Sequence, residues 1–202
     1  MTYRDALQAL SSETEAKVLA IYAAFSEGSI TYDEAAAAIA AVVVKGNARA
    51  VALADLALAA NLMTALRKPV ATLGLALPDG EPARLHKAAT TLLAIREVTP
   101  ERVARLGRVE PLEAGQRAFS EGIARSGSVE GWVRNKSASA CQLCTWWSRD
   151  GRVWPAGHPM PRHKGCSCTQ TIVHVDRVQE TAAGRKERIA REAATNTRRY
   201  NP

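Results

Sequence analysis

Aromatic residues are scarce in this chain. They make up 5% of the 202 residues, as four tryptophans, four tyrosines and two phenylalanines. A core with so few large rings is thin, and alanine, the residue with the highest helix propensity, is very frequent before residue 125. We therefore expect closely packed helices over the first two thirds of the chain.

Long apolar runs and targeting signals are also missing. No stretch of eighteen apolar residues free of charge occurs, so we expect no membrane span. No signal peptide is recognisable that would send the chain to an oxidising compartment. No internal repeat and no phosphate-binding glycine-rich motif is visible, so the sequence has no signature of a nucleotide-binding loop.

The chain divides by its residue pattern into three parts. They are a helical domain (1–130), a small β module rich in cysteine and histidine (131–175) and a basic C-terminal helix or tail (176–202). The predicted fold class is mostly α, with a zinc-stapled module formed by a β-hairpin or three strands. A stretch rich in glycine and proline at 69–82 is predicted to be a linker.

Apolar residues at spacings of three and four predict the helices of the first part. Thr31 and Glu34 form a capping-box pattern that starts the second one. Gly46 either stops that helix or is tolerated within it. The predicted helical ranges are 3–26, 35–44, 48–66, a segment from 83, 100–107 and 111–125. A last helical or irregular piece at 129–133 would deliver Trp132 as a hydrophobic plug on the module.

All four cysteines lie in one stretch of 28 residues, 141–168, which reads CQLCTWWSRDGRVWPAGHPMPRHKGCSC. Cys141 and Cys144 have two residues between them, and His163, Cys166 and Cys168 form a closing cluster. Thiolates and imidazole suit zinc, and a two-residue gap lets both sulfurs face one ion. The pattern predicts a tetrahedral Zn2+ site held by Cys141, Cys144, His163 and one of Cys166 or Cys168.

This zinc would be structural, because four protein ligands leave no open position for a water molecule. Glutamate is absent between Glu130 and Glu180, so the acid that zinc deaminases need beside the metal is missing. A nuclease of the His-Asn-His type would need a second histidine or an acid beside His163. Disulfides among the four cysteines are the alternative to a metal, with three pairings to choose from.

Three strands are predicted in the module. Residues 145–147 and 152–154 would pair around the turn signal of Asp150 and Gly151, and the β-branched run at 168–175 would add a third. His158 is a weaker ligand candidate than His163, because it precedes Pro159 in a loop. His86 is expected to be a surface or half-buried residue of a helix, and His174 a surface residue of a strand.

The order of these motifs resembles the phage head morphogenesis family, the Mu F-like minor head proteins. That family has a Cys-x-x-Cys, an Asp-Gly turn and a closing His-Pro-x-Cys-Arg-Cys, which match Cys141 to Cys144, Asp150 to Gly151 and His163 to Cys168 here. Lys164 and Ser167 replace the family's proline and arginine, and neither is a metal ligand. The similarity covers residues 132–173.

The resemblance implies a non-enzymatic minor capsid protein in the virion, with host cytoplasm as its place of assembly. Its partners would be the portal, the major capsid protein or both, in head morphogenesis and DNA delivery. The formal charge of +7 permits contact with packaged DNA through the basic tail. The alternative is a nucleic-acid-binding zinc module, in which Trp146, Trp147 and Trp154 stack on bases.

Overall fold

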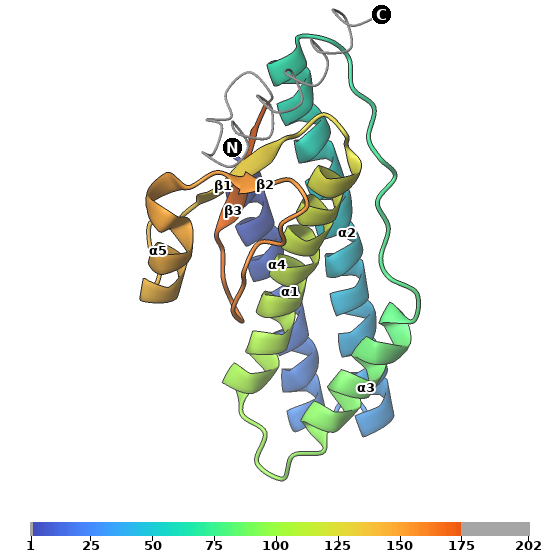
Figure 1. The fold of residues 1–202 in the computed structure, drawn as a ribbon. Coiled ribbons are helices and arrows are strands. Elements are labelled where there is room, and N and C mark those ends of the chain that lie inside the picture. The colour runs from blue at the N-terminus through green and yellow to red at the C-terminus, as the bar shows by residue number, and fades with distance from the viewer. Residues whose placement is uncertain (1, 175–202) are drawn as a thin grey trace, which may run out of the picture.

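The computed structural model describes residues 2–174, which form a mainly helical molecule with a small antiparallel sheet (Figure 1). This confirms the predicted fold class for the described residues, while the tail at 176–202 lies outside them. The helices are α1 (Tyr3–Ser26), α2 (Tyr32–Leu66), α3 (Glu81–Leu93), α4 (Pro100–Arg125) and α5 (Gln142–Ser148). A 3-10 turn (Arg149–Gly151) follows α5, and the strands are β1 (Gly131–Asn135), β2 (Trp154–Pro155) and β3 (Thr169–Val173).

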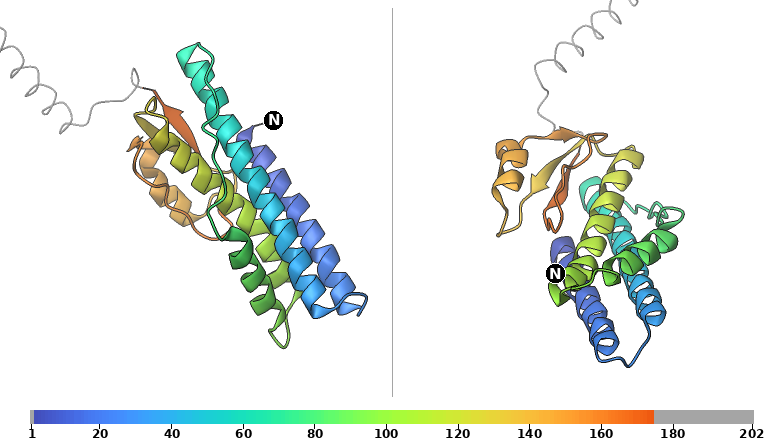
Figure 2. Two further views of the ribbon diagram at one scale, coloured as in Figure 1. Left: turned by 90° about the vertical axis from the view of Figure 1, so that its right-hand side faces the viewer. Right: turned by 90° about the horizontal axis from the view of Figure 1, so that it is seen from below.

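Helices α1, α2 and α4 lie side by side, and α3 packs against α2 (Figure 2). The core falls into two clusters along this bundle. One lies at the end near the sheet and includes Leu7, Leu58, Phe119 and Trp132. The other lies towards α3 and includes Val18, Ile39 and Leu85. Few of these side chains are aromatic, as the composition predicts.

Helix α2 runs without a break through Gly46, where the sequence pattern allowed either an end or a continuation of the helix. Its start is the predicted capping box, in which the backbone N–H of Glu34 donates to Thr31 Oγ1 and the Glu34 carboxylate accepts from the Thr31 N–H. Gly46 lies inside it because the helices approach closely there: a Cβ at this position would be 2.7 Å from Thr14 Oγ1 on α1. The glycine therefore serves packing and does not end the helix.

The prediction of two separate helices at 100–107 and 111–125 is wrong. A single helix, α4, runs through both ranges with Pro111 inside it. Proline removes one backbone donor from a helix interior, but packing against α1 holds this segment in place. Gly107 lies against the Glu15 backbone, and Ser11 Oγ donates to the Arg108 carbonyl at 2.7 Å. Tertiary contact outweighs the local signals to stop.

Helix α2 is long and apolar enough to cross a membrane by length and composition alone. A core helix of a soluble protein passes the same test, and 44% of its most apolar window is buried within the described structure. Its buried residues contact α1, α3 and α4. The structure therefore accounts for much of its apolar character as core packing.

The predicted linker is an extended segment that returns along the bundle from the end of α2 to the start of α3 (Figure 1). Asp55, a buried residue of α2, holds it there. The two oxygens of its carboxylate accept the backbone N–H groups of Leu73 at 2.8 Å and Leu75 at 3.0 Å. This linker is thus attached to the helices by specific hydrogen bonds.

The sheet has the strand order β2-β1-β3, with β1 antiparallel to both neighbours. The prediction of a helical or irregular piece at 129–133 is wrong, since most of it is the central strand. Partners from distant segments decide this: Trp132 pairs with Trp154 and with Ile172. The predicted strand at 168–175 is confirmed by β3, which spans Thr169–Val173.

The predicted hairpin around Asp150 is wrong. Residues 145–147 belong to α5, and β2 pairs with β1 instead. The N–H of Thr145 donates to the Cys141 carbonyl at 3.0 Å, which closes a helical turn. Asp150 and Gly151 do adopt the positive φ angles of a tight turn, 52° and 85°, but this turn follows a helix.

Candidate metal centre

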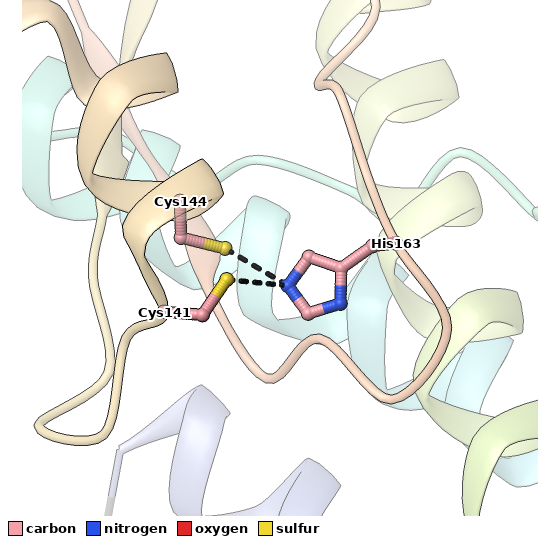
Figure 3. A group of neighbouring side chains, drawn as sticks. All are labelled: Cys141, Cys144 and His163. Carbon is pink, nitrogen blue, oxygen red and sulfur yellow. Dashed lines mark hydrogen bonds between the residues drawn. The ribbon is translucent and has the colours of Figure 1, made fainter.

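The cysteine and histidine side chains come together from two segments. Cys141 is the N-cap of α5 and Cys144 lies in its first turn, so one helical turn places both sulfurs on one side. His163 lies in the loop before β3, and its ring points toward both sulfurs (Figure 3). Cys166 and Cys168 follow on the same loop, and both are buried.

The separations between donor atoms are close to those around one tetrahedral ion. His163 Nε2 is 3.2 Å from Cys141 Sγ and 3.3 Å from Cys144 Sγ, and Cys144 Sγ is 3.4 Å from Cys166 Sγ. Bond lengths of about 2.3 Å to sulfur and about 2.0 Å to nitrogen give ligand separations of roughly 3.5–3.8 Å at a tetrahedral angle. A shift of a few tenths of an ångström would fit an ion between the donor atoms of Cys141, Cys144 and His163.

Two overlapping groups of donors result. Cys141, Cys144 and His163 form one, and Cys144, Cys166 and Cys168 form the other, with the ligand atoms of each within 4.8 Å of one another. Cys144 is shared, so the five side chains form one cluster that could hold a metal ion. All five predicted ligand candidates therefore lie together, and all four cysteines are free thiols.

Burial and mutual contact shift the pKa values of these thiols in opposite directions. Burial raises the pKa of Cys144 to about 11. Contact with Cys168, followed by burial, raises the pKa of Cys166, while the same contact lowers the pKa of Cys168 to about 4. A metal ion binds thiolates and displaces their protons. An ion in this cluster would therefore replace the hydrogen bonds between thiols with bonds from thiolates to the metal.

Arg134 of β1 is a buried neighbour of the cluster that the sequence analysis missed. It is 5% exposed, and its Nη1 lies 3.7 Å from Cys144 Sγ and 4.0 Å from Cys166 Sγ. Its Nη2 donates to the Pro161 carbonyl, and its guanidinium carbon is 5.4 Å from the centroid of Trp147. No sequence spacing marks it, because the pairing of β1 with β3 brings it there.

Gln116, in the middle of α4, is a second residue that the sequence analysis missed. Its buried side-chain amide donates to the carbonyls of Cys166 and Cys168. These hydrogen bonds attach the closing loop of the cluster to the helical bundle. The one feature of the sequence that could have indicated this role is a polar residue on the core-facing side of the helix predicted at 111–125.

The other histidines lie outside the cluster. His158 stacks on Trp154 with ring centroids 4.4 Å apart, and its carbonyl accepts from Trp132 Nε1 at 2.9 Å. His86 is exposed on α3, and His174 is half-buried at the end of β3. The preference for His163 over His158 as the ligand therefore agrees with the described geometry.

Trp132 is fully buried in the main core cluster, as the prediction of a hydrophobic plug requires. The other tryptophans differ in access. Trp147 is half-buried under Arg134, and Trp154 lies between Arg152 and His158. Trp146 is 59% exposed and presents its ring to solvent, whereas Trp147 and Trp154 are half-buried.

The fold and the cluster together define a helical protein with a small sheet and a cysteine–histidine centre that could hold a metal ion. Neither group of donors among the described residues contains a carboxylate. Comparisons with known proteins return no match: no family model, no curated protein and no solved structure matches this chain. What the centre does must be argued from its own chemistry.

Proposed function

We propose that the cluster binds one structural Zn2+ through Cys141, Cys144, His163 and Cys166. The observation that carries this is the position of His163 Nε2, which faces two cysteine sulfurs at 3.2 and 3.3 Å. Thiolate and imidazole donors at these separations suit zinc. We take Cys166 as the fourth ligand because its sulfur is 3.4 Å from that of Cys144, the residue that both donor groups share.

This ion would have a mechanical role. It would connect α5 to the loop that leads into β3, two segments that are otherwise joined through β1. Four protein ligands leave no position for a reacting water, and the donor groups include no acid that could move a proton. We therefore propose a non-enzymatic protein.

We further propose that the protein is a minor head protein of a bacteriophage, present in the virion and bound to the portal or the major capsid protein. Its support is the order of motifs from Trp132 to Cys168 behind a helical bundle. The bundle would supply the docking surface and the zinc would keep the module rigid. The basic tail would contact packaged DNA or an acidic surface of the portal.

Metal analysis tests the zinc. Protein purified under reducing conditions should carry about one zinc per chain, measured by native mass spectrometry and elemental analysis. Cys141→Ser should lose the metal and near-UV signal of the module but keep most of the helical signal, because the bundle has its own core. Ser167→Ala, which lies between Cys166 and Cys168 but offers no ligand, is the matched control.

A chain that carries no metal, with all four thiols titrating as free, contradicts the zinc proposal. The head role is tested separately, by purifying heads from cells that make the full chain or a chain without residues 177–202. Incorporation of both, in fixed proportion to the portal protein, supports docking through the described part. Absence of both from complete heads contradicts the role.

A nucleic-acid-binding zinc module is the second candidate, and the exposed ring of Trp146 is the observation that favours it. Stacking on such a ring is worth about 1–3 kcal/mol per base. Single-stranded DNA binding that weakens with salt and falls in Trp146→Ala would support it. Binding that does not change in this variant would leave only the basic tail as the contact.

A further inference from the structure

We propose that Arg134 is the buried counter-cation of the metal centre and positions Cys144 and Cys166 as its thiolate ligands. This rests on the proposed zinc site and adds a residue that is not itself a ligand. A guanidinium group that is 5% exposed has lost most of its hydration, and a buried charge is stable only when it is paired or well hydrogen-bonded.

The partners of Arg134 show where that compensation comes from. Its Nη1 faces the sulfurs of Cys144 and Cys166 at 3.7 and 4.0 Å, and its Nη2 donates to a carbonyl. The Nε atom is buried without a hydrogen-bond partner. The ion pairs found within residues 2–174 do not include Arg134. The sulfurs of Cys144, Cys166 and Cys168 are thus the groups beside it in that range that can carry the opposite charge.

The charge count of the proposed site agrees with this arrangement. A zinc ion with three thiolates and one neutral imidazole carries one net negative charge, and one guanidinium neutralises it. A fourth thiolate in place of His163 would add a second negative charge, which one guanidinium does not neutralise.

The surroundings of Arg134 fix the guanidinium in place. The ring of Trp147 lies 5.4 Å from its carbon, and Pro161, two residues before His163, supplies the carbonyl. The strand β1 that carries it pairs with β3 directly after the cysteine loop. Residues that contact the ligands of a metal in this way commonly change its affinity by about 10- to 100-fold when replaced.

The test compares Arg134→Met, which removes the charge at similar length, with Arg134→Lys, which keeps it. Arg152→Met is the matched control, because Arg152 covers Trp154 and touches no ligand. Zinc affinity is measured by competition with a chelator on the full chain. We expect Arg134→Met to weaken binding by about 10- to 100-fold, Arg134→Lys to recover part of this loss, and Arg152→Met to bind as the unchanged chain does.

A second measurement separates charge compensation from simple packing. The thermal midpoint of Arg134→Met should fall more in the zinc-loaded protein than in the metal-free protein, because weaker zinc binding also removes part of the stability that the bound ion adds to the folded state. Equal falls in both forms overturn the proposal, as does a lysine variant that binds zinc no better than the methionine variant. If the unchanged chain binds no zinc, the proposed function fails first.

Discussion

The side-chain amide of Gln116 donates to the backbone carbonyl of Cys168 at 2.9 Å, across the boundary between the helical bundle and the metal centre. The same nitrogen also donates to the carbonyl of Cys166. The middle of α4 thus holds the backbone of the loop that carries Cys166 and Cys168, and the candidate metal centre is anchored from outside its own sequence segment.

Replacement of this glutamine should destabilise the centre. Gln116→Leu leaves two carbonyls without their donor, and each buried unsatisfied group costs about 1–3 kcal/mol. We expect a lower urea midpoint of unfolding and weaker zinc binding. Gln8→Leu, at an exposed position on α1, is the control and should change neither. A Gln116→Leu protein with unchanged midpoint and affinity would show that the anchor is dispensable.

Gly131 should not tolerate a side chain. A Cβ there would be 2.5 Å from the Trp154 carbonyl oxygen, which is backbone and cannot move aside without breaking the contact between β1 and β2. Gly131→Ala should therefore lower the free energy of unfolding by about 1–3 kcal/mol, as overpacking does. Gly157→Ala in the same module has open space at its Cβ and is the control. Chemical denaturation of both variants checks the difference.

Gly46 and Thr14 should show coupled effects. Alanine at position 46 would gain about 1 kcal/mol of helix propensity, but its Cβ would be 2.7 Å from Thr14 Oγ1. We expect Gly46→Ala to be destabilising by itself and less so when Thr14→Ala removes the atoms it meets. A double-mutant cycle of unfolding free energies measures this coupling. Strictly additive effects would contradict the close contact of α1 with α2.

Glu81 should make the bundle sensitive to acid. Its nearly buried carboxylate accepts hydrogen bonds from Arg84 and Asn47, and the first of these lowers its pKa. A lowered pKa in the folded state stabilises the protein above the unfolded value of about 4.3, and this stability is lost as the pH falls through the folded pKa.

Urea unfolding between neutral pH and pH 3 measures this effect. Glu81→Gln should be less stable than the unchanged chain at pH 7, with a difference that shrinks in acid. Glu27→Gln, at an exposed position after α1, should have the same pH profile as the unchanged chain. An equal difference between Glu81→Gln and the unchanged chain at all pH values would mean that the charge of Glu81 does not matter.

Local signals in the sequence determined much of this protein. The capping box of Thr31 and Glu34 starts α2 where the residue pattern predicts it. The β-branched run before His174 forms β3. The spacing of Cys141 and Cys144 and the closing group after His163 were enough to predict which side chains gather. The capping box and the strand depend on residues within a few positions of one another, and so does the spacing inside each of the two ligand groups.

Only the tertiary structure decided the rest, because those choices depend on partners distant in sequence. Pro111 lies inside a helix because α1 packs against that segment. The segment at Trp132 is a strand because β2 and β3 supply its hydrogen-bond partners on both sides, from residues 154 and 172. Arg134 reaches the cysteines through that same pairing, and Gln116 reaches them from α4. A buried charge and a buried amide find their partners only when the chain has folded, so no local pattern could have named those partners.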